Sequence, residues 1–165
     1  ASNRVNDIAL GAGGVLWAAT EPETESWTVG GGVSRRNADG TWSTFDEADG
    51  LDELFTTGIA AGDEGVIWVS STDGVRRRDA DGTWTHFGSR EGLPSGEVAA
   101  IELDRDGDLW VGTSNGAGRL HPDGTIDTYG PAEGLGDVEV RSIGVGETAG
   151  WVGHLFHGVS RMVLR

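Results

Sequence analysis

The sequence contains no cysteine and no lysine, and each absence removes a class of structure or chemistry. Without cysteine the chain can form neither a disulfide framework nor a thiolate metal site, and its sequence carries no information on the redox state of its compartment. With neither residue present, and no serine in a nucleophile elbow, covalent nucleophilic catalysis has poor support. No apolar run approaches the ~20 residues that span a bilayer, so we expect no membrane insertion.

Basic residues are also scarce, because twelve arginines stand against 27 acidic residues and the formal net charge is −15. A surface this negative repels nucleic-acid phosphates, so we expect no nucleic acid as a partner. What the chain does have is 29 glycines and 7 tryptophans beside only 4 prolines. This composition indicates a folded chain with many tight turns.

An internal repeat is the strongest pattern in the sequence. Asp-Gly pairs recur every 42 residues, at Asp39-Gly40, Asp81-Gly82 and Asp123-Gly124. Trp17, Trp68, Trp110 and Trp151 follow with steps of 51, 42 and 41, so the first repeat carries an insertion of 9 residues. The four tryptophans therefore occupy equivalent positions, and we expect all of them to be largely buried.

Each repeat contains four short strand signals separated by turns, which in the third repeat are EVAAIELD, DLWVGT, GAGRLH and TIDTYG. The inner strands are apolar on both faces, as expected for small sheets packed between neighbours. The sequence therefore predicts an all-β fold, a β-propeller made of four-stranded antiparallel blades. The blades fall at about 5–54, 55–96, 97–138 and 139–165, within a single domain or propeller segment, 1–165. The last blade lacks its outermost strand.

The stretch EGLPSGEVAAIELDRDGDLWVGTSNGAGRL, with its echoes GVIWVSSTDGVRRRDADGTWTHF and GVLWAAT, resembles the two-component regulator propeller repeat. The resemblance covers essentially the whole chain. It implies an extracytoplasmic (periplasmic or secreted) sensor region and a propeller of more blades than this chain holds. It also implies a ligand face, built from the loops that join second to third strands and the loops that join one blade to the next.

Breaks in the repetition gather on that loop face, and such breaks often mark a binding face. They predict Trp27, in the insertion, and His154, Phe156 and His157, in the last repeat, as ligand-binding residues. The alternative is that Trp27 caps the first blade and Phe156 fills a gap in an irregular last one. The two histidines have no evident third ligand, so we predict no metal. We also predict no cofactor and no catalytic residue.

Two further patterns have a structural interpretation. Arginines recur on the third strand of every repeat and should be held by acceptors between strands, with the acids of the same period as candidate partners. These residues are Arg35, Arg77, Arg119 and Arg161, with Asp49, Glu91 and Glu133. The motif DRDGD, at Asp104 to Asp108, is a turn rather than a calcium loop, because its glycine falls one position early and no bidentate glutamate follows.

Three functions remain open. The preferred one is a non-catalytic recognition or sensory propeller that binds a small molecule, a glycan or a protein on its loop face. The second is an enzyme similar to the streptogramin-lyase-like propellers, with His154, His157 and Glu139 as acid-base groups. The third is a structural unit that self-assembles. Since the first four residues are too few to complete the last blade, we expect the chain to be a homo-oligomer or a fragment of a longer propeller.

Overall fold

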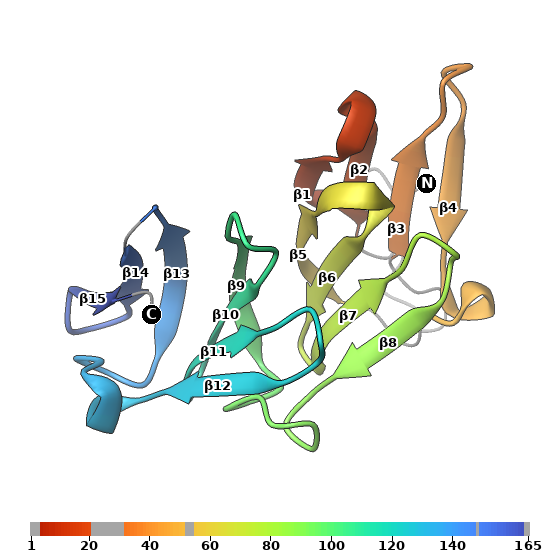
Figure 1. Cartoon of the computed structure of the whole chain (residues 1–165). Helices are drawn as coiled ribbons and strands as arrows, with labels where there is room; N and C mark the ends of the chain where they lie inside the picture. The colour runs from red at the N-terminus through yellow and green to blue at the C-terminus, as the bar shows by residue number, and fades with distance from the viewer. Residues whose placement is uncertain (1–3, 21–31, 52–54, 148, 164–165) are drawn as a thin grey trace. The chain divides into compact units, whose positions relative to one another are not determined.

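The structure is a computed structural model that describes residues 4–20, 32–51, 55–147 and 149–163. Among these residues the regular structure consists of fifteen strands and four short 3-10 turns, and no α-helix occurs. The strands form four antiparallel sheets, in each of which neighbours in sequence are neighbours in space (Figure 1). No helix in the described ranges is long and apolar enough to cross a membrane.

The sheets correspond to the four repeats. The first contains β1 (Val5–Leu10), β2 (Leu16–Thr20), β3 (Gly32–Arg36) and β4 (Trp42–Phe45), and the second β5 (Thr56–Ala61), β6 (Ile67–Ser71), β7 (Gly74–Arg78) and β8 (Trp84–Phe87). The third contains β9 (Val98–Leu103), β10 (Leu109–Thr113), β11 (Gly116–Leu120) and β12 (Ile126–Tyr129). The last contains only β13 (Val140–Val145), β14 (Ala149–His154) and β15 (Val159–Val163) in the described chain. The 3-10 turns are η1 (Ala12–Gly14), η2 (Glu47–Asp49), η3 (Asp63–Gly65) and η4 (Pro131–Glu133).

The chain divides into two compact units, Ala1–His86 with the first two blades and Phe87–Arg165 with the last two. In each unit a hydrophobic core lies between two sheets. The first core is built around Trp17, Val33, Ile59, Ile67 and Val69. The second is built around Trp110, Ala117, Val140, Val152 and Met162. Inner strands such as β6 and β10 are buried along their whole length, as their apolar sequences predict.

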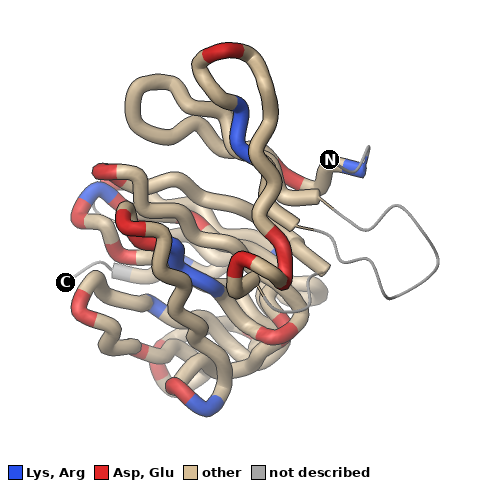
Figure 2. Tube along the Cα trace, turned by 90° about the vertical axis from the view of Figure 1, so that its right-hand side faces the viewer, with Lys and Arg blue, Asp and Glu red and all other residues tan. Residues whose placement is uncertain are grey.

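The predicted Asp-Gly hairpin turns are confirmed. The glycines Gly40, Gly82 and Gly124 have φ angles of 85°, 95° and 89°, which glycine adopts without strain. In the first turn the Asp39 carboxylate accepts hydrogen bonds from the hydroxyl and the backbone N–H of Thr41, and the hydroxyl contributes most to lowering the pKa of Asp39. Many acidic residues occupy such turns (Figure 2), where their charge remains solvated.

Three of the four repeat tryptophans are buried at equivalent second-strand positions. Trp17, Trp68 and Trp110 are 4%, 2% and 0% exposed, but Trp151 is 49% exposed, so the prediction for Trp151 is wrong. In blades 1 and 3 this face of the sheet packs against the following blade. The corresponding face of β14 is covered by no later strand of the described chain.

The periodic arginines stack on the periodic tryptophans, which supports their structural role. Their guanidinium carbons lie 5.7, 5.8, 5.1 and 6.0 Å from the ring centroids in the pairs Arg35–Trp17, Arg77–Trp68, Arg119–Trp110 and Arg161–Trp151. The acids proposed as partners have another role: Asp49, Glu91 and Glu133 each accept a backbone N–H from three residues earlier and close the turn before the next blade. The acceptors found for the guanidiniums lie at other turns: Asn37 and Asp79 directly after the third strand, and Asp104 and Asp108 in the turn between β9 and β10.

Candidate functional site

The predicted ligand residues that the structure describes lie together at the end of β14 and in the loop that follows it. His154 is the last residue of β14, and Phe156 and His157 belong to the loop before β15. Trp27 lies outside the described residues. The loop between blades 3 and 4 reaches the same place, because the Leu155 N–H donates to the Glu139 carbonyl oxygen at 3.2 Å.

His154 replaces a hydroxyl residue that the other three blades share. The hydroxyls of Thr20, Ser71 and Thr113 each donate to the carbonyl oxygen of the first residue of the next strand, at 3.1, 3.4 and 2.8 Å. These bonds close the loop between second and third strands in blades 1 to 3. In blade 4 no such side-chain bond is formed: the His154 N–H donates to the Gly158 carbonyl oxygen at 2.9 Å, and the imidazole makes other contacts.

The imidazole of His154 is buried and only partly satisfied. Its Nε2 lies 2.7 Å from Ser160 Oγ, which also accepts the Gly136 N–H at 2.8 Å. If the serine hydroxyl donates to Nε2, the ring proton resides on Nδ1. That nitrogen is buried and has no hydrogen-bond partner among the described residues. The ring therefore retains one unused polar atom, which is unusual for a buried side chain.

A second polar pair and an exposed aromatic ring lie in the same loop. His157 Nδ1 is 2.9 Å from Asp137 Oδ2, and accepting this hydrogen bond is the main reason why the pKa of Asp137 is lowered. Phe156 is 75% exposed. We call Asp137, His154, Phe156, His157 and Ser160 the fourth-blade loop site.

Asp137 and Ser160 were not among the predicted site residues, and they lie 20 and 6 residues from their histidine partners. The available signal was that His154 occupies a position where the other three repeats carry threonine or serine. Glu139, the third acid-base candidate, forms an ion pair with Arg141. No group of three or more metal-ligating side chains is present within the described part of the chain.

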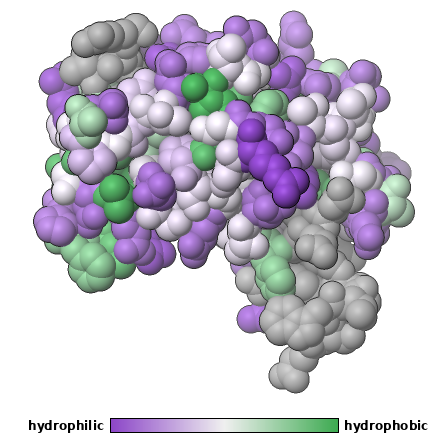
Figure 3. All heavy atoms as spheres, turned by 90° about the horizontal axis from the view of Figure 1, so that it is seen from below, coloured by the Kyte–Doolittle hydropathy of each residue, from purple (hydrophilic) through white to green (hydrophobic). Residues whose placement is uncertain are grey.

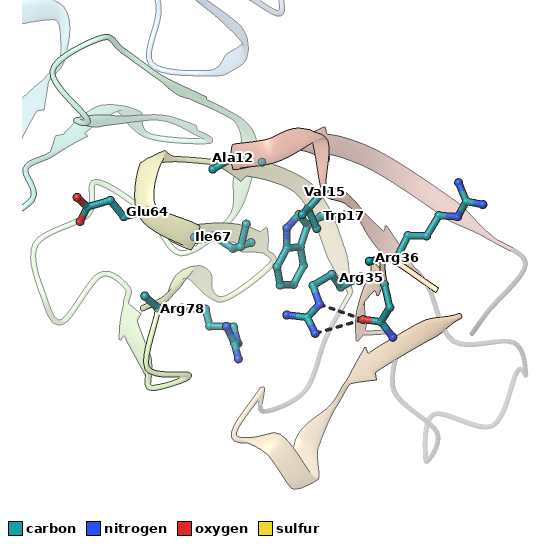
Figure 4. A pocket seen from close by; sticks show the side chains of 13 residues that line it. Ala12, Val15, Trp17, Arg35, Arg36, Glu64, Ile67 and Arg78 are labelled. Carbon is teal, nitrogen blue, oxygen red and sulfur yellow. Dashed lines mark hydrogen bonds between the residues drawn. The ribbon is translucent and has the colours of Figure 1, made fainter. Parts of the chain in front are cut away.

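A pocket of about 280 Å³ lies in the first unit, between blades 1 and 2 (Figure 4). It is lined by the β1–β2 and β3–β4 turns and their counterparts in blade 2, at the end of these blades opposite to the β2–β3 connection. Its lining includes Val15, Trp17, Arg35, Ile67 and Arg78. This pocket was not predicted from the sequence.

Several large apolar side chains are exposed, among them Val5, Ile8 and Leu10 on β1 and Trp151, Leu155, Phe156 and Val159 in the last blade. On the face drawn in Figure 3, hydrophobic residues form small separate groups among hydrophilic ones. None of the groups on this face is large, and the polar loop site and the pocket are the candidates for binding.

Comparison with known proteins supports the predicted fold. The family model for the two component regulator propeller matches residues 92–115, which lie within the stretch that carried the resemblance. No curated protein sequence matches the chain. The extracellular domain assigned to the hybrid two component system BT3049 of B. thetaiotaomicron is similar in structure, with a TM-score of 0.76 and 21% identity over 98% of this chain.

Two further solved structures share the fold. A streptogramin B lyase gives a TM-score of 0.69 at 17% identity over 98% of this chain, and the computationally designed protein Ika4 gives 0.74 at 11% over all of it. The chain spans 22% of the BT3049 domain, 55% of the lyase and 94% of the design. At these identities the likeness concerns the fold alone. The chain thus has the all-β propeller fold, and its residues 92–115 match the family model for the two component regulator propeller.

Proposed function

We propose that the chain is a non-catalytic recognition module of an extracytoplasmic sensor, and that it binds its ligand at the fourth-blade loop site. The structural similarity to an extracellular domain assigned to a two component system supports this role. Because the chain spans only 22% of that domain, signalling itself would belong to a larger assembly.

The observation that carries the proposal is the replacement of a loop-closing hydroxyl by His154. A buried polar atom without a partner costs about 1–3 kcal/mol, and Nδ1 of His154 is such an atom among the described residues. A threonine, as in blades 1 and 3, would avoid this cost. Residues that reduce stability without a structural benefit are typical of binding sites, where stability is lost in favour of function.

The chemistry of the site favours a small polar ligand with one apolar face. Phe156 offers an exposed ring for stacking, and His157 and Asp137 offer a donor and acceptor pair. A carbohydrate has both an apolar ring face and hydroxyl groups, so a glycan fits the site best among the ligand classes that the sequence leaves open.

The test compares the wild-type chain with His154→Thr and Phe156→Ser on an immobilised glycan panel, followed by calorimetry on any glycan retained. The matched control is Thr72→Ala, in the exposed loop between β6 and β7 of blade 2. We expect both loop-site variants to lose binding and the control to keep it. We also expect His154→Thr to raise the free energy of unfolding, and a fall in stability would contradict the proposal even before a ligand is known.

A lyase is the second candidate, because a streptogramin B lyase shares the fold and the three acid-base candidates lie near one loop. The direct assay follows the loss of a streptogramin B antibiotic by chromatography, with His157→Gln as the control variant. Turnover that His157→Gln abolishes would establish the lyase and exclude a purely recognising role. Assembly with further copies stays a prediction, which the molecular mass in solution tests.

A further inference from the structure

In blade 3 the stacked pair of Trp110 and Arg119 is hydrogen-bonded to the side-chain carboxylate of Asp104. Asp104 Oδ2 accepts hydrogen bonds from Trp110 Nε1 at 3.0 Å and from Arg119 Nη2 at 3.2 Å. Asp108 adds a second ion pair to the same guanidinium, at 2.6 Å. The side chains of Asp104, Asp108 and Arg119 are only 5%, 7% and 10% exposed, so this is a well-buried, charge-assisted arrangement.

Blade 1 has the same pair without the carboxylates. In blade 3 the turn between the first two strands is closed by a hydrogen bond from the Asp104 N–H to the Asp108 carbonyl oxygen, at 3.0 Å. In blade 1 the equivalent bond runs from the Gly11 N–H to the Val15 carbonyl oxygen, at 2.9 Å. Trp17 and Arg35 are stacked as in blade 3, but Gly11 and Val15 provide no charge. Blade 2 also has a glycine and a valine at this turn, Gly62 and Val66, but its Arg77 is paired with Asp79, whereas Arg35 of blade 1 has no carboxylate partner among the described residues.

The polar groups that Asp104 satisfies in blade 3 lack a comparable partner in blade 1. The Trp17 indole N–H has no acceptor among the described residues. Arg35 donates from Nε and Nη2 to the amide oxygen of Asn37, at 3.3 and 3.2 Å, and this acceptor is neutral. Because a bond to a carboxylate is stronger than a bond to an amide, an incoming carboxylate would draw the guanidinium from Asn37.

These groups line the pocket between blades 1 and 2, together with a second guanidinium. Arg78 lies 4.8 Å from the Phe45 ring centroid, and its buried Nε has no partner in the described chain. In Figure 4 the guanidinium groups of Arg35 and Arg78 lie on the same side of the Trp17 ring, and the Glu64 carboxylate points away from them. The charged lining is three arginines, including the exposed Arg36, and one glutamate, in a chain whose net charge is −15.

We propose that this pocket binds the carboxylate of a small organic acid. The carboxylate takes the position that the Asp104 side chain takes in blade 3 and accepts from Trp17 Nε1 and Arg35, while Val15 and Ile67 contact the apolar part of the ligand. A volume of about 280 Å³ is at the lower end for small-molecule sites, so the acid is compact, with one ring or a short chain. The site belongs to a different unit from the fourth-blade loop site and does not depend on it.

The test uses benzoate and D-glucuronate as probes, benzamide and D-glucose as their neutral counterparts, and sulfate as an inorganic anion. Binding is measured by calorimetry and by the rise in melting temperature. Gly11→Asp supplies the missing carboxylate from the chain itself, at a residue whose φ of −84° and ψ of −176° suit any side chain. Its Cβ would lie 3.3 Å from Trp17 Nε1, so the indole must shift slightly.

The matched control is Gly62→Asp, which makes the same change at the equivalent turn of blade 2, where Gly62 has a φ of −90° and does not line the pocket. We expect at least one carboxylate to bind in preference to its neutral counterpart. Gly11→Asp should weaken this binding by about tenfold or more, the effect of a charge-assisted hydrogen bond, and Gly62→Asp should leave it within about twofold. Gly11→Asp should also melt at a higher temperature than Gly62→Asp.

A second variant, Arg35→Gln, removes the guanidinium without filling the pocket and should abolish the preference for carboxylates if Gly11→Asp fails to fold. Three results would overturn the proposal: equal binding of acids and neutral counterparts, undiminished binding in Gly11→Asp or Arg35→Gln, or binding of sulfate alone. The last result would identify a site for inorganic anions. A null result for the His154 variants would leave the pocket proposal intact.

Discussion

Replacing Trp110 by alanine tests how far the packing between blades stabilises the chain. Trp110 is 0% exposed, stacks on Tyr129 with ring centroids 5.4 Å apart, and donates to Asp104 at 3.0 Å. Truncation of a buried aromatic side chain costs about 3–5 kcal/mol. We expect a loss of about 4 kcal/mol, since Asp104 keeps Arg119 as a partner when the indole is removed. In a domain of this size that loss corresponds to a fall of about 8–16 °C in melting temperature.

The equivalent Trp151 provides the matched control, because it occupies the same position in its blade but is 49% exposed. Trp151→Ala should cost about 1 kcal/mol, as expected for a side chain whose burial is incomplete. Urea unfolding followed by circular dichroism measures both variants without relying on tryptophan fluorescence. A loss below about 1 kcal/mol for Trp110→Ala, or equal losses in the two variants, would refute the assigned register of blade 3.

Three further predictions concern single side chains. The carboxylates of Asp127 and, to a smaller extent, Asp108 stabilise the charged form of His121 and raise its pKa. The contribution of charged His121 to stability is therefore complete below pH 6.5 and is lost as the pH rises through the raised pKa. His121→Gln should flatten this pH dependence of the melting temperature. Gly116→Ala should cost about 2–3 kcal/mol in urea unfolding, because Gly116 has a φ of 117° and its Cβ would lie 2.5 Å from a carbonyl oxygen. Glu64→Gly should raise the stability by about 0.5 kcal/mol, since Glu64 has a φ of 55° that glycine adopts without strain.

The blades could be predicted from the sequence because their determinants are local. Turns at Asp-Gly pairs and apolar inner strands each depend on residues that are close in sequence, and they recur with a step of 42 residues. The structure confirms the sheets that this pattern predicts. Trp17, Trp68 and Trp110 are buried as predicted, and for Trp17 and Trp110 the covering residues belong to the following blade of the same unit. Trp151 is exposed although its residue type and strand position match those of the buried tryptophans, because burial depends on a neighbouring sheet.

The contacts of the candidate sites could not be predicted in the same way. The pairing of His154 with Ser160 and of His157 with Asp137 depends on how one loop folds over another, which the spacing of residues does not specify. The pocket was harder still to predict, because it results from side chains that are missing. Only the comparison of Gly11 with Asp104 in the folded structure shows that a carboxylate is absent.

A repeat protein supplies its own reference for judging which departures concern function. His121 departs from the repeat, since blades 1 and 2 carry Asn37 and Asp79 at this position, yet both of its ring nitrogens find carboxylate partners within the blade. The hydrogen bonds of His121 are therefore satisfied within the chain, and this departure from the repeat requires no ligand. His154 and the Trp17–Arg35 pair differ from it, because each leaves a polar group without a matching partner among the described residues where an equivalent blade has one. Polar groups without hydrogen-bond partners reduce stability. We therefore expect binding first at the fourth-blade loop site and at the pocket beside Trp17 and Arg35, where a departure from the repeat coincides with such a group.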